Sequence, residues 1–454
     1  MNLPNYFLAD LPPEATLSPA MITEACQTLK RNRAQYLAQR STHSLVGVLC
    51  AVAEAWLKPD NSFRKLALEL GPEKAGFSKA TLQKGLDNFF RQFTPDNFHA
   101  LLVQELGDAQ RLDRFVAGDS GEKSNRMALA IGPEFLVHIA AGNLPNPALM
   151  SIVPGLLTRS AQFVKCASGS AFLPRLFAHS IYDADPKLGA CLEIAEWRGG
   201  KADLETVLFA EADCVTATGS DETLAAIRAR LPVKIRFLGH GNRVSFGFVA
   251  HEVLSGFHAR QIVSRTTDDV VAWNQLGCLS PHVIYVQTGG EVSPEKFAEL
   301  LADELERREQ TEPRGELPAE HAAAIASRRG IYEVRAAHSP ETTQHWCSRN
   351  STAWTVVYEA DARFQLSCLN RFIYVKPVRD LAEALRYAEM VRDQVSTVGL
   401  GVPEHKLEEL ATQLARWGAT RVCPLGRMQN PPLTWRHDGR PALGDLVLWT
   451  DFEE

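Results

Sequence analysis

Short apolar runs alternate with helical segments from about Met127 onward, and this alternation limits the folds open to the chain. The first runs are Phe135–Ala140, Gln162–Ala167, Cys214–Thr218, Lys234–Leu238 and Val244–Val249. Many of their residues are β-branched, which favours strands over helices. Strands separated by helices are typical of βαβ units, so the pattern predicts an α/β protein with mainly parallel sheets.

A second series of runs repeats the pattern at His282–Gln287, Arg371–Lys376 and Thr420–Cys423. Between them, a serine followed by a proline predicts the start of a helix over Ser293–Arg308. The sequence therefore predicts two α/β units.

The N-terminal part differs, because apolar residues between 18 and 106 recur at helical spacing. Ser18 and Ser78 are the expected N-caps. We expect a helical N-terminal region (1–115), two α/β domains (116–250 and 251–430) and a C-terminal tail (431–454).

The composition excludes several classes of protein. The chain has 454 residues and a formal net charge of −6 with no long basic run, which argues against nucleic-acid binding. The longest apolar stretch, Leu45–Leu57, contains Glu54 and is shorter than a membrane-spanning helix. The N-terminal residues lack the pattern of a signal peptide. Nine cysteines without a Cys-x-x-Cys pair argue against a disulfide framework and a structural zinc site, so we expect a reducing cytoplasm and no metal.

Cys278 is the candidate nucleophile. It follows Gly277 in an expected tight turn and precedes the apolar strand at 282–287. A thiol there, next to a glycine that lets a substrate approach the backbone, can accept an acyl group. The same spacing also fits a buried, inert thiol.

The usual phosphate-binding signatures are missing. The chain has neither Gly-x-Gly-x-x-Gly at a strand-to-helix turn nor Gly-x-x-x-x-Gly-Lys-Ser/Thr. Gly239-His240-Gly241 lies between two expected strands and fits a hairpin or a close backbone approach better.

Several segments, taken in order, resemble one family. They are 138–145 (HIAAGNLP), 163–168 (FVKCAS), 218–223 (TGSDET), 237–247 (FLGHGNRVSFG) and 273–281 (WNQLGCLSP), with 369–371, 375–378 and 435–439 later in the chain. This set resembles the LuxC-type acyl reductases of bacterial bioluminescence operons, a branch of the aldehyde dehydrogenase superfamily. The resemblance covers about residue 135 to the end. It implies two Rossmann-like lobes, with cofactor bound by 116–250 and the nucleophile carried by 251–430.

The resemblance implies a role for two residues in acyl chemistry. Cys278 would take the acyl group from a thioester as a thiolate. Asn143 would donate its amide to the oxyanion, a contact worth roughly 3 kcal/mol in such sites. Asn143 could instead be the N-cap of the following helix.

Four further residues would bind a nicotinamide dinucleotide. Lys165 matches the lysine that contacts the adenosine ribose, unless it is a solvent-facing strand end. Ser168 stands where relatives that prefer NAD often carry Glu, and its neutral side chain favours NADPH. The N–H groups of Gly219 and Ser220 would receive the pyrophosphate at a helix N-terminus, although Ser220 could be only a helix cap.

Departures from the superfamily pattern indicate the direction of the reaction. Phe237 stands where hydrolytic relatives carry the Glu that activates water. The Glu that binds the nicotinamide ribose has no counterpart near 364–369. Without a water-activating base, an acyl-cysteine should survive until it is reduced to an aldehyde or transferred to a thiol.

The alternatives are a CoA-acylating dehydrogenase acting on shorter aldehydes, the same reductase in a biosynthetic cluster unrelated to bioluminescence, and a non-catalytic scaffold. The resemblance implies an acyl-activating synthetase as a partner and a homo-oligomer.

His240 and His437 could move protons to the forming aldehyde, but a lone histidine is more often structural. Asp268 and Asp269 fit a helix start or a solvated face.

Overall fold

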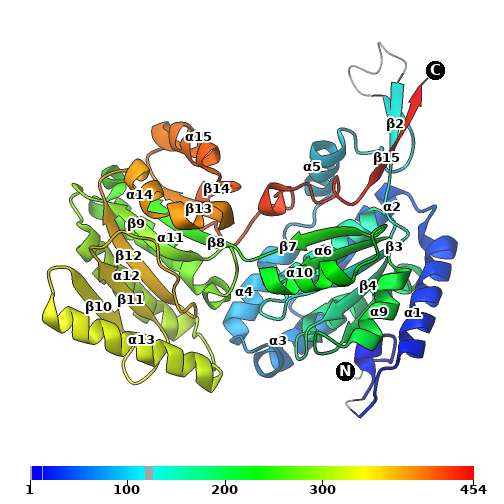
Figure 1. The fold of residues 1–454 in the computed structure, drawn as a ribbon, viewed down its shortest axis with the longest axis horizontal. Coiled ribbons are helices and arrows are strands. Elements are labelled where there is room, and N and C mark those ends of the chain that lie inside the picture. Colours follow the sequence, from blue (N-terminus) through cyan, green and yellow to red (C-terminus); the bar gives the residue numbers. More distant parts are fainter. Residues whose placement is uncertain (1–2, 13, 118–125, 454) are drawn as a thin grey trace. The chain divides into compact units, whose positions relative to one another are not determined.

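The computed structural model describes residues 3–12, 14–117 and 126–453 (Figure 1). Met1 and Asn2, which begin the stretch tested for a signal peptide, lie outside the described residues. The chain divides into two compact units: residues 1–75, 86–241 and 432–454 form unit 1, and 76–85 with 242–431 form unit 2. The expected N-terminal region, first α/β domain and tail thus fall mostly in unit 1, and the expected second domain in unit 2. No described helix has the length and apolar character needed to cross a membrane.

Unit 1 is built on a five-stranded parallel sheet in the order β5-β4-β3-β6-β7. Its strands are β3 (Phe135–Ile139), β4 (Ala161–Cys166), β5 (Leu192–Glu196), β6 (Cys214–Thr218) and β7 (Arg236–His240). The helices of unit 1 are α1 (Pro19–Asn32), α2 (Thr42–Leu57), α3 (Ser62–Ala75), α5 (Pro95–Leu106), α6 (Asn146–Leu157), α7 (Phe172–Ala184), α8 (Pro186–Gly189), α9 (Ala202–Glu211) and α10 (Asp221–Arg230). Side chains of α1, α9 and α10 join one apolar cluster with β3, β4 and β6.

Unit 2 is built on a seven-stranded sheet in the order β10-β11-β12-β9-β8-β13-β14, parallel except for β10. Its strands are β8 (Val244–Val249), β9 (Pro281–Gln287), β10 (Thr343–Cys347), β11 (Thr355–Glu359), β12 (Phe372–Val378), β13 (Val395–Gly401) and β14 (Arg421–Pro424). The helices are α11 (Gly256–Val271), α12 (Pro294–Thr311), α13 (Ala319–His338), α14 (Leu381–Tyr387) and α15 (Leu407–Trp417). Helix α4 (Lys79–Phe90) begins in the 76–85 segment of unit 2.

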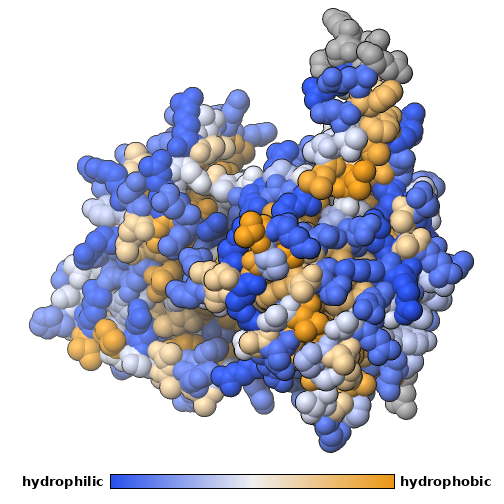
Figure 2. Space-filling model, turned by 45° about the vertical axis from the view of Figure 1, so that its right-hand side comes forward, coloured by the Kyte–Doolittle hydropathy of each residue, from blue (hydrophilic) through white to orange (hydrophobic). Residues whose placement is uncertain are grey.

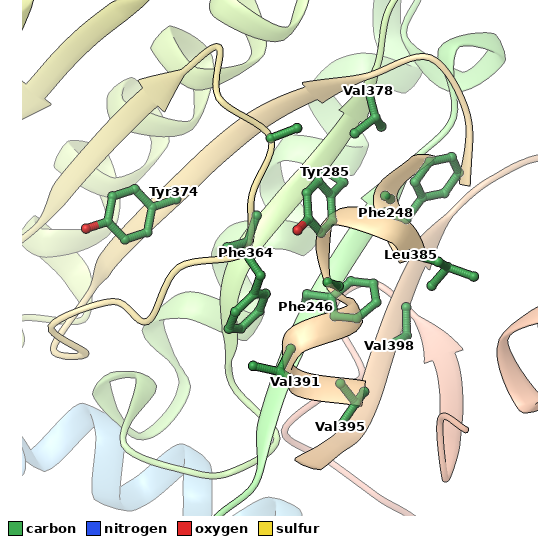
Figure 3. Close-up of a cluster of buried hydrophobic side chains, with 14 of the residues drawn as sticks. Phe246, Phe248, Tyr285, Phe364, Tyr374, Val378, Leu385, Val391, Val395 and Val398 are labelled. Atoms are coloured by element: carbon green, nitrogen blue, oxygen red, sulfur yellow. The ribbon is translucent and has the colours of Figure 1, made fainter. Parts of the chain in front are cut away.

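Separate apolar clusters bury this second sheet. One cluster joins aromatic side chains of β8, β9 and β12, including Phe246, Tyr285 and Tyr374, to aliphatic residues such as Leu385 and Val398 (Figure 3). Another cluster contains Phe297, Leu301 and Leu305 of α12, and the partly buried Leu300 packs against it. The helical spacing at 293–308 predicts these four side chains to face inward. Because both faces are covered, β9 is buried along almost its whole length.

A third, antiparallel sheet in the order β1-β2-β15 joins distant parts of unit 1. Its strands are β1 (Val116–Ala117), β2 (Arg126–Ile131) and β15 (Leu448–Glu453). Every residue of β15 is exposed, including Leu448, Trp449 and Phe452. Figure 2 shows apolar side chains gathered along this sheet.

The α/β fold and the N-terminal helices are confirmed, and so are the caps at Ser18 and Ser78, which accept from Met21 N and Thr81 N. The hairpin expected around Gly239–Gly241 is wrong, because β7 and β8 belong to different sheets. The alternative, a close approach to the glycine backbone, is confirmed. The Asp221 carboxylate lies so close to Gly241 that it would overlap a Cβ at that position.

The interpretation of Asp268 and Asp269 as a helix start or solvated pair is wrong for Asp269. Both lie near the C-terminal end of α11, and Asp269 is buried. Its carboxylate accepts the N–H groups of Gly426 and Met428 and so holds the loop after β14. Burial raises the pKa of Asp269 to about 7. Asp268 instead pairs with Lys84 and Arg308 at the surface.

Candidate active site

Cys278 lies in a turn between the short helix Ala272–Gln275 and β9, as its sequence context predicts. Its side chain is half-buried, and its carbonyl accepts a hydrogen bond from Ser245 Oγ at 2.8 Å. Ser280 N donates to Gly277 O at 2.9 Å and closes the turn. The thiol therefore sits on backbone that is held from β8 and within the turn itself.

The backbone before Cys278 adopts a conformation that few residues accept. Trp273, Asn274 and Gln275 have φ values of 50°, 51° and 64°, in the left-handed region. A second left-handed run, at 369–371, precedes β12 with φ values of 58°, 55° and 66°. Each non-glycine residue in this region costs about 1–2 kcal/mol, so other interactions must stabilise both runs.

Arg371 links the two left-handed runs. Its side chain is fully buried, and its Nε donates to Asn274 Oδ1 at 3.1 Å. Its Nη1 donates to Glu309 Oε2 and to Glu312 O, both at 2.8 Å. Burial lowers the pKa of Arg371 to about 10. The guanidinium thus joins the turn of Cys278 to β12 and to the end of α12.

Gln275 and Trp273 complete the support of this turn. Gln275 Nε2 donates to Pro281 O at 2.7 Å and to Phe372 O at 2.9 Å, which bridges β9 and β12. The Trp273 indole packs so closely on Gly85 that a Cβ there would lie 2.0 Å from the ring. The conformation around Cys278 is therefore fixed by buried side chains on several elements.

Most of the other cysteines are unsuited to nucleophilic chemistry. Burial raises the pKa of their thiols, which disfavours the reactive thiolate. The pKa values rise to about 12 for Cys26, Cys166 and Cys191 and to about 11 for Cys214 and Cys423, and those of Cys50 and Cys368 are also raised.

Asn143 lies in the loop between β3 and α6, at the carboxyl edge of the sheet of unit 1, and its side chain is exposed. The alternative role as an N-cap does not hold. Pro145 occupies the N-cap position of α6, and no side chain caps this helix. The position of Asn143 leaves the oxyanion role as a prediction.

Lys165 is buried at the end of β4, so the alternative of a solvent-facing strand end is wrong. Its Nζ lies 5.8 Å from the centre of the Trp197 ring. Burial lowers the pKa of Lys165, and the charges of Glu205 and Glu196 oppose this shift. Ser168 follows in an exposed turn with Gly169, whose φ is +80°.

The predicted pyrophosphate position at the start of α10 fits poorly. Gly219 N donates to His240 O at 3.1 Å, so this N–H is already engaged. Ser220 Oγ caps α10 by accepting from Thr223 N at 3.2 Å. Asp221 and Glu222 fill the first turn, and hydrogen bonds from its own N–H and from Ser220 lower the pKa of Glu222. This helix start carries its own negative charge, which opposes a second anion.

His240 and His437, considered separately in the sequence, lie together in unit 1. Their rings stack 4.2 Å apart with an angle of 5°, and His240 Nδ1 lies 3.2 Å from Asp438 Oδ2. Among the described residues, these three have ligand atoms within 4.8 Å of one another. An imidazole binds a metal in the plane of its ring, and two parallel stacked planes cannot both contain one ion. We therefore assign no metal to this group.

The family model for the acyl-CoA reductase LuxC matches residues 37–449 of the chain. This protein belongs to the LuxC acyl-CoA reductase family. A long-chain acyl-protein thioester reductase from Photorhabdus laumondii is 22% identical over 419 residues, which cover 90% of this chain and 82% of the relative. One from Aliivibrio fischeri is 24% identical over 358 residues, or 77% of this chain and 69% of the relative.

Solved structures confirm the aldehyde-dehydrogenase fold of this LuxC-family chain. An NADP-dependent glyceraldehyde-3-phosphate dehydrogenase from Bacillus halodurans aligns with a TM-score of 0.68 at 15% identity, covering 96% of this chain and 92% of the other. An NAD-dependent benzaldehyde dehydrogenase from Corynebacterium glutamicum aligns with a TM-score of 0.70 at 12% identity, covering 97% and 91%.

Membership of this reductase family implies a nicotinamide cofactor. The residues at the ends of β4 and β5 fit its adenosine ribose, because Trp197 leaves a buried indole N–H without a partner among the described residues. Sequence reasoning did not single out Glu196, the last residue of β5, or Trp197, which follows it. The Glu-Trp pair at the end of the strand beside β4 was the available signal.

Proposed function

We propose that this protein reduces an acyl thioester to an aldehyde through an acyl-cysteine at Cys278, using NADPH. The observation that carries the proposal is the turn of Cys278, a half-buried thiol that follows left-handed backbone held in place by buried Gln275 and Arg371. Membership of the LuxC family supports the same reaction class.

The protein would act in two steps. Cys278 attacks the thioester carbonyl, the carrier thiol leaves, and Asn143 donates its amide to the developing oxyanion. A nicotinamide cofactor, when bound, would supply the hydride for the second step, in which the C–S bond of the acyl-cysteine breaks, the aldehyde is released and Cys278 is regained as the thiolate. Phe237, a side chain without acid–base chemistry, lies in β7 where hydrolytic relatives have a base, which favours reduction over hydrolysis of the acyl-cysteine.

The preference for NADPH rests on Ser168 and Lys165. Ser168 adds no negative charge near a 2′-phosphate, and the Lys165 ammonium adds a positive one. Ser220 stays in the proposed cofactor site through its backbone N–H, and the acidic first turn of α10 weighs against that contact. The engaged N–H of Gly219 weighs against a contact from that residue.

The relatives named above act on long-chain acyl groups carried by proteins, and we extend this to a long acyl chain on CoA, an acyl-carrier protein or a partner acyl-activating synthetase. We also propose a homo-oligomer formed through β15. This strand lies at the edge of its sheet and exposes Leu448, Trp449 and Phe452, and such an edge is a ready site for pairing. Light scattering of the wild type and of Trp449→Glu/Phe452→Glu tests this, since the double variant should be monomeric.

The function is tested by NADPH oxidation with a panel of acyl-CoAs, comparing the wild type with Cys278→Ala. Cys423→Ala serves as the control, because it removes another half-buried thiol. We expect aldehyde formation with long acyl chains in the wild type and control and none in Cys278→Ala. Equal turnover by all three proteins would overturn the assignment.

A further inference from the structure

The loop after β4 is held by a carboxylate from the neighbouring strand. Glu196, the last residue of β5, pairs with Cys166 of β4 across the parallel ladder. Its Oε1 accepts Gly169 N at 2.7 Å, and its Oε2 accepts Ala171 N at 3.0 Å. The carboxylate thus binds the short loop that contains Ser168.

The surroundings of Glu196 indicate a ligand. Trp197 is 3% exposed, and its Nε1 has no hydrogen-bond partner among the described residues. A buried donor without an acceptor costs about 1–3 kcal/mol. The Lys165 Nζ lies 5.8 Å from the same ring. A ligand with both hydrogen-bond acceptors and negative charge would satisfy these two donors.

The position of Glu196 in the sheet suggests which part of a ligand it meets. Open parallel sheets bind nucleotides beyond the carboxyl ends of their strands, and in dinucleotide-binding proteins an acid there accepts the ribose 2′-hydroxyl. Each carboxylate oxygen has two lone-pair sites, so Glu196 can accept a hydroxyl in addition to its backbone N–H groups. A 2′-phosphate offers no such donor and would be repelled.

We propose that Glu196 is a specificity-determining residue that sets the ratio of NADPH to NADH binding. Ser168 lacks the acid found in NAD-preferring relatives, but Glu196 brings a carboxylate to the same loop from the next strand. Lys165 and Ser168 favour the 2′-phosphate, and Glu196 opposes it. The inference rests on the proposed use of a nicotinamide cofactor.

The test is calorimetric titration of the full-length protein with 2′,5′-ADP and with 5′-ADP, which carry the adenosine ends of the two cofactors. Removing one charge close to the phosphate should change relative affinity by about tenfold. Glu196→Gln should therefore raise the affinity for 2′,5′-ADP about tenfold relative to 5′-ADP. Asp203→Asn, an exposed acid in the first turn of α9, should leave the ratio unchanged.

The two ligands separate specificity from a merely structural role. If Glu196 only holds the loop, Glu196→Gln weakens both ligands together and the ratio stays at the wild-type value, which overturns the proposal. Binding of neither ligand by the wild type also overturns it. The titration needs no turnover, so the predicted shift in a protein that forms no aldehyde would refute the proposed reductase function and leave the specificity assignment standing.

Discussion

The turn that carries Cys278 in unit 2 and the loop that carries Ser168 in unit 1 are built in different ways. The first is fixed by buried side chains, among them Asn274, Gln275 and Arg371, on left-handed backbone. The second is exposed and held through backbone N–H groups by Glu196. The proposed nucleophile would need a fixed position, whereas the loop that we propose to select between similar cofactors could be tuned by single charges. Substitutions should therefore affect stability in the first region and selectivity in the second.

The largest effect on the free energy of unfolding should come from Arg371→Met. The variant leaves Asn274 and Glu309 without the guanidinium that joins them, and breaking a buried charged contact costs about 3–5 kcal/mol. Urea unfolding should show this loss, and peptide mapping should show a changed rate of Cys278 alkylation. Arg307→Met removes an exposed ion pair with Glu304 and should cost less than about 1 kcal/mol. Equal stability of the two variants would show that Arg371 does not stabilise the turn of Cys278.

Each unit contains a buried histidine that should make it sensitive to acid. Burial lowers the pKa of His138 in β3 and of His282 in β9 to about 4. Ser367 N donates to His282 Nδ1, which requires the neutral ring. The unfolded chain takes up protons from about pH 6.5, so the stability each neutral ring contributes is present above that pH. It is lost progressively as the pH falls from 6.5 toward 4, by roughly 3 kcal/mol for each residue once pH 4 is reached.

Urea unfolding between pH 7 and pH 4.5 measures this loss in the wild type. His138→Asn and His282→Asn should each flatten the pH dependence, and exposed His405→Asn should not. Parallel curves for all four proteins would show that neither ring is held neutral.

Gly85→Ala should have an intermediate effect on the free energy of unfolding. The added methyl would overlap the Trp273 indole and disturb the left-handed backbone before Cys278, at a cost of about 1–3 kcal/mol. Gly47→Ala is a matched control, because Gly47 also lies in a helix but has nothing within 4 Å of its Cβ position. The control should gain about 0.5–1 kcal/mol from helix propensity. Thermal unfolding of both variants distinguishes overlap from propensity, and a stabilised Gly85→Ala would refute the close packing.

The smallest effect on stability, and the sharpest on selectivity, should come from Ser168→Glu. The new carboxylate should lower the NADPH-to-NADH ratio of kcat/KM about tenfold, with little change in unfolding. Adding Glu196→Gln should return the ratio toward the wild-type value. A double variant no different from Ser168→Glu would mean that the two positions do not act on the same phosphate.

The sequence predicts strands well where they are continuous apolar runs. The observed bounds of Cys214–Thr218 and Val244–Val249 equal the expected ones. The strands at Leu192–Glu196 and Val395–Gly401 were not expected, because Glu, Ser, Thr and Gly interrupt their apolar pattern. Their burial comes from neighbouring strands and helices, which a local pattern does not contain.

The candidate site could be predicted from the sequence only where its motifs are local, and the roles of its residues stay predictions. Cys278, Asn143 and Lys165 stand out because their motifs are local. Glu196 acts on a loop that belongs to another strand, and the contact between Arg371 and Asn274 joins distant segments. Asp269 was misread because an acid beside another acid suggests a surface, while its partners lie in the loop after β14.

The most direct test of the account is mass spectrometry of the protein mixed with a long-chain acyl-CoA and no reducing cofactor. We predict a mass increase of one acyl group, located by peptide mapping at Cys278, absent from Cys278→Ala and lost with aldehyde release when NADPH is added. An acyl group on another cysteine, or none on a protein that still forms aldehyde, would contradict the acyl-cysteine mechanism.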